Sequence, residues 1–156
     1  MRKVFNEQPK LGVIDISEIK IDMTSRDEVP RVLLGLQFIY VNIDLRHQVF
    51  NILDEALPEK SKKGLGRNGM SAWEILVLAS IKKSCDADND RLKDMSDNHT
   101  NIRDMLGLSP VFDKEKKYAL QTLKDNIPLL KPKTLGRINQ LIVEYGQEQA
   151  GKEPNA

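Results

Sequence analysis

The chain has 156 residues, of which 40% are hydrophobic and 30% charged, a composition that predicts one folded domain able to bury a core without disulfides or metal. Lys and Arg outnumber Asp and Glu by only 24 to 23, so overall charge makes no case for nucleic acid, and 5% aromatic residues are too few for a single-strand stacking surface. With no apolar run of about 18 residues and no apolar stretch after the basic start, we expect a cytoplasmic protein that makes no contact with a membrane.

Residues 1–24 are predicted to form an extended N-terminal arm. Apolar and polar side chains alternate in parts of residues 11–23, which fits either a short half-exposed strand or an extended segment. Beyond the arm, Asp27 is expected to cap a helix, because Pro30 then falls in the first turn, where its missing N–H is tolerated. The apolar residues within 32–40 follow a helical stripe, so this helix should be largely buried.

The next helix has the most regular apolar pattern in the chain. Asp44 is expected to cap it, Leu45, Val49 and Ile52 fall on one face, and Pro58 ends it. Because only a few residues separate this helix from the previous one, we expect the two to pack as an antiparallel hairpin.

An exposed basic loop is predicted over residues 59–68. The segment EKSKKGLGRN has no helical or strand periodicity, two glycines, and four cations against one acid. If the protein binds DNA, these cations are expected to contact phosphates, and four contacts would give a log–log salt dependence of about −3.6. The four cations are Lys60, Lys62, Lys63 and Arg67.

A buried central helix is predicted to follow this loop. Ser71 and Glu74 have the spacing of a capping box, and Met70 and Ile75 have that of a hydrophobic staple. Residues 72–79 are apolar on almost every side, which indicates a helix surrounded by others. We expect this helix to be the centre of the core.

Shorter helices are predicted beyond it. Polar residues 86–90 interrupt the apolar pattern, and two short stripes over residues 90–97 and 100–106 follow, the second closed by Gly107. A further helix is predicted over residues 114–126, where apolar side chains again lie on one side.

The last predicted helix follows Pro132, with Thr134 as its cap, and residues 150–156 are expected to be a frayed tail. The pattern as a whole predicts a mainly α fold, a multi-helix orthogonal bundle that forms a single domain over residues 25–149 after the short extended arm. Within this domain, residues 71–107 have the outline of a helix-turn-helix-like unit, because three helices are joined there by short turns.

The sequence predicts no catalytic or metal-binding site and no cofactor. The glycine loop at residues 64–69 lacks the lysine and the serine or threonine of a phosphate-binding loop. His47 and His99 have no nucleophile placed beside them, and the single cysteine, Cys85, excludes an internal disulfide. One run of acids resembles the start of a calcium loop but lacks its glycine and terminal glutamate. Its members are Asp86, Asp88 and Asp90.

The helix-turn-helix outline is the remaining functional signal, because the last helix of such a unit can present side chains to a major groove. Helix 100–106 and the turn before it are therefore the candidate recognition element. Four residues of this unit are expected to be exposed and suit phosphates or base edges. They are Arg91, Lys93, Asn101 and Arg103, and the neighbouring Asp94, Asp97 and Asp104 count against a strongly basic surface.

Five blocks of the sequence, in collinear order over residues 25–130, resemble the N-terminal region of bacterial insertion-sequence transposases. The resemblance is to an unclassified group of these proteins whose full-length members carry a DDE catalytic domain of RNase H type after this region. The blocks are SRDEVPRVLLGLQFIY (25–40), GRNGMSAWEILVLA (66–79), NDRLKDMSDNH (89–99), IRDMLG (102–107) and YALQTLKDNIPLL (118–130).

The resemblance implies a helical domain that binds double-stranded DNA at the terminal inverted repeats of the element and that can form a homo-oligomer. It implies no catalysis by this chain, because the family's metal-binding carboxylates, and the Mg²⁺ they hold, belong to the later domain. Asn89 stands where family members often have an aromatic residue, and the loop KSKKGLGRN is peculiar to this sequence. No base-reading role is therefore assigned to a named residue.

A second interpretation stays open. The same helices, with their leucine-rich faces, could dimerise or dock on another domain without touching DNA, in which case the basic loop at residues 59–68 would be only a linker.

Overall fold

The structure is a computed structural model that describes residues 12–22, 28–57 and 70–152, with the side chains of the last stretch described as far as Tyr145. The described residues are mainly helical and contain no strand, so the predicted α bundle is confirmed and the strand alternative for the arm is wrong. The elements are η1 (Ile16–Glu18), α1 (Val29–Val41), α2 (Ile43–Ala56), α3 (Ala72–Ser84), α4 (Asn89–Asn98), α5 (Thr100–Met105), α6 (Leu120–Asn126), η3 (Ile127–Leu129) and α7 (Pro132–Lys152).

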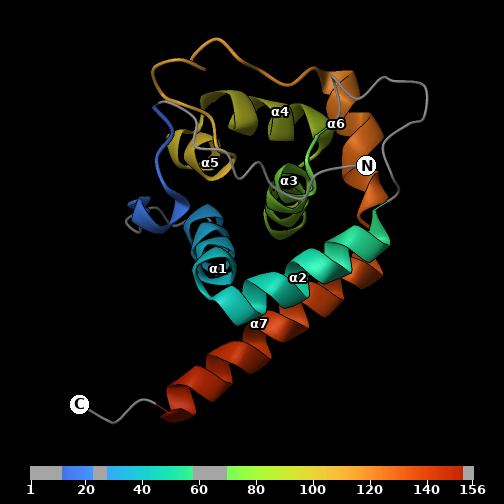
Figure 1. Cartoon of the computed structure of the whole chain (residues 1–156). Coiled ribbons are helices and arrows are strands. Elements are labelled where there is room, and N and C mark those ends of the chain that lie inside the picture. Colours follow the sequence, from blue (N-terminus) through green and yellow to red (C-terminus); the bar gives the residue numbers. More distant parts are fainter. Residues whose placement is uncertain (1–11, 23–27, 58–69, 153–156) are drawn as a thin grey trace.

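Helix α3 lies at the centre of the bundle, as predicted. In Figure 1 it is seen nearly end-on, with α4 lying across the view above it and α1 and α6 on either side. Helices α2 and α7 contact each other and run side by side in opposite directions below it. Almost every apolar side chain of α3 is buried, which explains why its sequence has no polar face.

Trp73 connects α3 to its neighbours. Its side chain is completely buried, and its indole N–H donates to the backbone carbonyl of Met105 at 2.8 Å, next to the end of α5. The rings of Tyr40 on α1 and Phe50 on α2 meet the indole edge-on, with centroid distances of 5.6 and 6.2 Å. Because a buried indole N–H needs an acceptor, this contact fixes α5 against the core.

The start of α3 has the predicted capping box. The Ser71 hydroxyl accepts from the Glu74 amide at 3.2 Å, and a Glu74 carboxylate oxygen accepts from the Ser71 amide at 3.0 Å. Met70 and Ile75, the predicted staple pair, are both buried.

Helices α1 and α2 meet at a corner instead of forming the predicted antiparallel hairpin (Figure 1). Only Asn42 separates them, and one residue is too short to reverse the chain. Asn42 is also the N-cap of α2, so Asp44, the predicted cap, lies two positions further in, within the first turn. The Arg46 guanidinium donates to the Tyr40 carbonyl at the end of α1, and the Asn42 side-chain amide adds a second hydrogen bond to the Phe38 carbonyl, which already accepts from the Asn42 backbone N–H.

The N-terminal arm is held against α1. Its described part, residues 12–22, contains the single turn η1 and no other helix or strand, and Ile16 and Ile19 are buried in the core. The Gln37 side-chain amide on α1 donates to the carbonyls of these two residues at 2.9 and 3.0 Å. The predicted cap Asp27 lies outside the described residues, and α1 begins at Val29 after Glu28.

The two last helices differ from the predicted boundaries. Helix α6 begins at Leu120 rather than at residue 114, because residues 108–119 form a separate loop described below. Helix α7 begins at Pro132, so Thr134 lies in its first turn and is not its cap. The helix continues to Lys152, past the predicted start of the tail at residue 150, and residues 153–156 lie outside the described part.

None of the helices within the described ranges is both long and apolar enough to cross a membrane.

Replacing Trp73 by Ala is expected to lower the free energy of unfolding by about 3–5 kcal/mol. The substitution leaves a cavity at the centre of the core, and it removes the N–H that donates to the Met105 carbonyl. Urea unfolding followed by circular dichroism measures this. Val143→Ala, which truncates a side chain that is 55% exposed, is the control and should change stability by less than about 0.5 kcal/mol. Equal effects of the two substitutions would contradict the central role of Trp73.

Candidate nucleic-acid interface

The three helices of the predicted helix-turn-helix-like unit all form. Asp88 caps α4 by accepting from the Arg91 amide at 2.8 Å, and the His99 ring caps α5 by accepting from the Ile102 amide at 3.3 Å. Helix α5 ends at Met105 with Leu106 as its C-cap, and the next residue, Gly107, has a φ of +84°, which suits glycine. The sequence therefore predicted these elements and their order correctly.

Helix α5, the predicted recognition element, is partly covered by the N-terminal arm. The Asn101 side-chain amide donates to the Lys20 carbonyl at 3.2 Å, and its oxygen accepts from the Asp22 amide at 3.3 Å. Asp104 on the same helix is buried, and burial raises the pKa of its carboxyl, while a hydrogen bond from Asn101 acts in the opposite direction. The expected exposure of Asn101 is wrong, because the arm crosses it.

Arg103 is also not the exposed side chain that the sequence predicted. Its guanidinium donates to three backbone carbonyls, that of Ser96 at 3.0 Å and those of Asp113 and Lys116 at 2.8 Å each. The planar guanidinium with its five N–H donors suits such a cluster of acceptors. Arg103 therefore ties the end of α4 to the loop that follows α5.

Helix α4 carries the two other predicted residues of the unit. Arg91 is exposed, as expected, whereas Lys93 is half-buried and pairs with Asp97 at 2.6 Å. Asp90 and Asp94 are exposed on the same helix. This side of the unit therefore carries both signs of charge.

The remaining predicted phosphate contacts lie outside the described residues. They are Lys60, Lys62, Lys63 and Arg67.

A loop of residues 109–118, here named the braced loop, was missed by the sequence reasoning. The Ser109 hydroxyl accepts from the amides of Val111 and Phe112, and the Asp113 carboxylate accepts from the Ser109 amide at 2.8 Å. The Asp113 amide in turn donates to the Ser109 carbonyl at 3.0 Å. Serine and proline at 109–110 followed by aspartate at 113 are turn-forming residues, and this signal could have revealed the loop.

The braced loop ends at a buried tyrosine. The Tyr118 hydroxyl donates to the Glu74 carboxylate, on the oxygen that does not accept from Ser71. Burial, followed by the negative charge of Glu74, raises the pKa of Tyr118 well above its usual value of 10.0. This hydrogen bond connects the loop to the start of α3.

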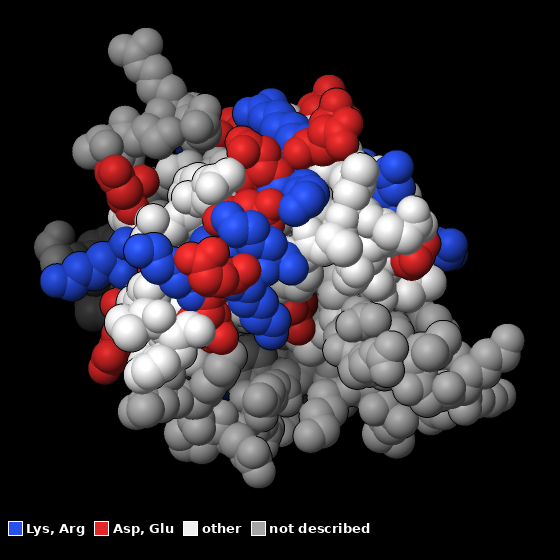
Figure 2. Space-filling model, turned by 90° about the horizontal axis from the view of Figure 1, so that it is seen from above, with Lys and Arg blue, Asp and Glu red and all other residues white. Residues whose placement is uncertain are grey.

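The outer surface of the braced loop is apolar at its tip and mainly basic beyond it. Val111 and Phe112 are 69% and 62% exposed, and three exposed lysines follow. Figure 2, which looks down on this side of the molecule, shows Lys and Arg side chains in its centre with Asp and Glu between them. The three lysines are Lys114, Lys116 and Lys117.

A groove with mostly apolar walls lies between α1, α3 and α7 and has a volume of about 320 Å³. Leu36 and Ile39 line it from α1, and Ile138 and Ile142 line it from α7. No group of three or more His, Cys, Asp or Glu within the described ranges could hold a metal ion. The structure thus offers two surfaces that could take a partner, the face around the braced loop and this groove.

No family model, no curated protein and no solved structure matches the chain.

Replacing Arg103 by Lys is expected to destabilise the fold by about 1.5–3 kcal/mol, because an ammonium group cannot reach the three carbonyls that the guanidinium bonds. Urea unfolding measures the loss. Arg91→Lys makes the same chemical change at an exposed position of α4 and should cost less than about 0.5 kcal/mol. Equal stability of the two variants would show that Arg103 does not hold the loop.

Tyr118 should give the fold a pH dependence in the alkaline range. The pKa of Tyr118 is higher in the folded than in the unfolded chain, so the folded state binds the hydroxyl proton up to a higher pH. The free energy of unfolding should therefore fall as the pH rises above about 10. Tyr118→Phe should be about 1 kcal/mol less stable near pH 8 and should lack this part of the fall. Unfolding curves between pH 8 and 11 test this, with Tyr145→Phe as the control for loss of a tyrosine hydroxyl. An unchanged slope in Tyr118→Phe would disprove the assignment.

Proposed function

We propose that the chain is the DNA-binding N-terminal region of an insertion-sequence transposase and that it recognises the terminal inverted repeats of the element. The observation that carries the proposal is that the blocks of resemblance meet in space through specific side chains. Trp73 in the second block donates to Met105 in the fourth, and Tyr118 in the fifth donates to Glu74 in the second. The blocks therefore contain the contacts that assemble one folded unit.

The same blocks supply much of the core. Leu33, Leu36 and Ile39 of the first block are buried in α1, and Leu92 and Ile102 of the third and fourth blocks are completely buried. A resemblance that extends over these buried positions and over the capping box is consistent with a common helical fold. It adds support to the proposal beyond the likeness of any single block.

On this proposal, DNA binding depends on local clusters of cations. The chain has a net charge of only +1, and the face in Figure 2 carries acids among its cations. Long-range attraction to DNA would then be weak, and most of the affinity would come from a few direct phosphate contacts. We assign no catalytic residue to this chain, and the Mg²⁺-dependent chemistry of transposition would belong to a separate DDE domain.

The groove between α1, α3 and α7 favours a second candidate, a helical module that dimerises through this groove without touching DNA. Its walls are mostly apolar, and Val143 at its edge is 55% exposed. An exposed apolar groove is typical of a surface that another helix covers.

Fluorescence anisotropy separates the two candidates. The chain is titrated into a labelled duplex that carries the source element's inverted repeat and into a scrambled duplex, each at about 50 and 200 mM salt. We expect tighter binding to the repeat and a clear loss of affinity at the higher salt, because phosphate contacts release counterions.

Sedimentation equilibrium of the same sample supplies the second readout. Equal or absent binding to both duplexes, together with the mass of two chains, would reject the DNA-binding proposal and favour the dimerisation module.

A further inference from the structure

We propose that the braced loop is a DNA-contacting element of this domain, an inference that rests on the proposed DNA-binding function. Lys114, Lys116 and Lys117 would bind phosphates, while Val111 and Phe112 at the tip would lie against the groove of the duplex.

The loop backbone is held in one shape by hydrogen bonds at both of its ends. Ser109 and Asp113 close its first half through four hydrogen bonds, and Arg103 holds the carbonyls of Asp113 and Lys116 in its second half. Tyr118 fixes its end to Glu74 on α3. A surface whose backbone is already ordered loses less conformational entropy on binding than a flexible one.

The three lysines of the loop outnumber its two acids. Glu115 is exposed, whereas Asp113 is half-buried and its carboxylate, still negatively charged, accepts a hydrogen bond from the Ser109 amide. No ion pair of these lysines occurs within the described parts of the chain, and all three are exposed. An exposed lysine on an ordered backbone is well placed to bind a phosphate as a point charge.

The tip of the loop is apolar. Phe112 is 62% exposed, yet its ring packs beside Gly12 of the arm, where a Cβ atom would come within 2.8 Å of the ring. Gly12 has a φ of +82°, which glycine adopts without strain, so its lack of a side chain makes room for the ring. Proteins that bind the minor groove commonly combine an apolar side chain with flanking cations, and this tip has both.

The experiment uses the anisotropy assay with the full chain and the duplex carrying the source element's inverted repeat. The variant Lys114→Gln/Lys116→Gln/Lys117→Gln should lose about tenfold or more in affinity at the lower salt concentration. Its log–log salt slope should fall in magnitude by up to about 2.7, because each phosphate contact contributes about 0.9. Phe112→Ala should weaken binding about fivefold and leave the slope unchanged, since it removes apolar contact but no charge.

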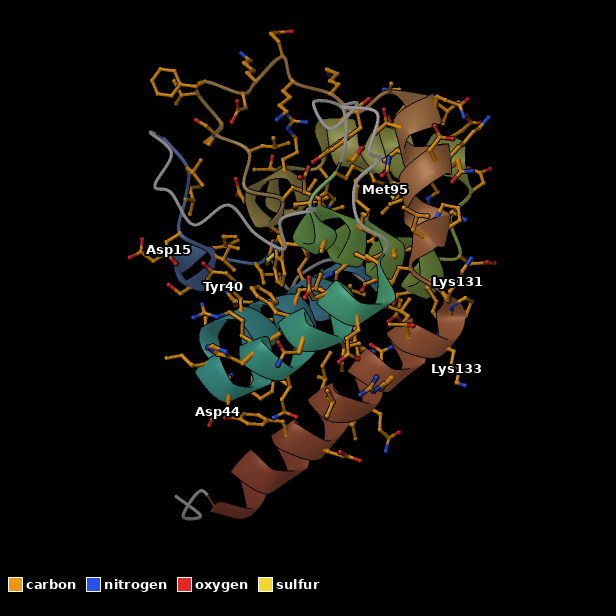
Figure 3. The ribbon with its side chains drawn as sticks, turned by 45° about the vertical axis from the view of Figure 1, so that its right-hand side comes forward. Asp15, Tyr40, Asp44, Met95, Lys131 and Lys133 are labelled. Carbon is orange, nitrogen blue, oxygen red and sulfur yellow. The ribbon has the colours of Figure 1, made fainter. Side chains whose placement is uncertain are left out.

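A matched control removes three cations from a different part of the surface. Figure 3 places Lys131 and Lys133 at the start of α7, on the opposite side of the molecule from Asp15 in the arm. The variant Lys131→Gln/Lys133→Gln/Arg137→Gln should therefore keep the wild-type affinity and slope. The loop variant should also fold, because Arg103 holds Lys116 by its backbone carbonyl and not by its side chain. Thermal unfolding of each variant checks this.

Three outcomes would overturn the inference. If the loop variant keeps the wild-type affinity and slope while the wild type binds in a salt-sensitive way, DNA is bound elsewhere and the proposed function stands. If the loop and control variants lose affinity equally, affinity depends on the net charge of the protein, and the loop makes no specific contact with DNA. If the wild type itself binds no duplex, both the inference and the proposed function fail.

Discussion

The carboxylate of Glu74 is the point on which the arrangement of this surface depends. One of its oxygens accepts from the Ser71 amide and closes the capping box of α3, and the other accepts from the Tyr118 hydroxyl at the end of the braced loop. Trp73, in the same turn of α3, donates to the carbonyl of Met105 at the end of α5. The first turn of α3 therefore positions both ends of the segment between α5 and α6, Met105 at one end and Tyr118 at the other. Segments distant in sequence are thereby connected through one turn of helix.

Arg103 completes this arrangement and shows how a charged residue can be structural. Its guanidinium connects the end of α4 to the braced loop by bonding the carbonyls of Ser96, Asp113 and Lys116, of which that of Asp113 also accepts from the Lys116 amide. A buried or half-buried carbonyl without a donor is costly, so an arginine in this place stabilises an irregular segment that has no ladder of its own. The cationic side chain that resembled a DNA contact in the sequence instead supports the lysines next to it.

The sequence predicted those parts of the fold that depend on local chemistry. The capping box at Ser71, the all-apolar α3 and the glycine at the end of α5 each follow from the spacing of neighbouring residues, and all three are present. The corner between α1 and α2 and the late start of α6 were predicted wrongly. The corner follows from the single connecting residue Asn42, whereas the late start of α6 accompanies the hydrogen bonds of Arg103 and Tyr118, which no local periodicity encodes.

The same distinction applies to the candidate interface. The sequence placed four cationic or amide side chains on the surface of the helix-turn-helix-like unit, and of these Arg91 alone is exposed. The arm bonds the amide of Asn101, the braced loop accepts from Arg103, and Asp97 pairs with Lys93. The exposed lysines next to this unit lie instead on the braced loop, whose carbonyls Arg103 bonds. Base reading by Asn101 of α5 would require the arm to leave this side chain, because the backbone of Lys20 and Asp22 now occupies its amide group.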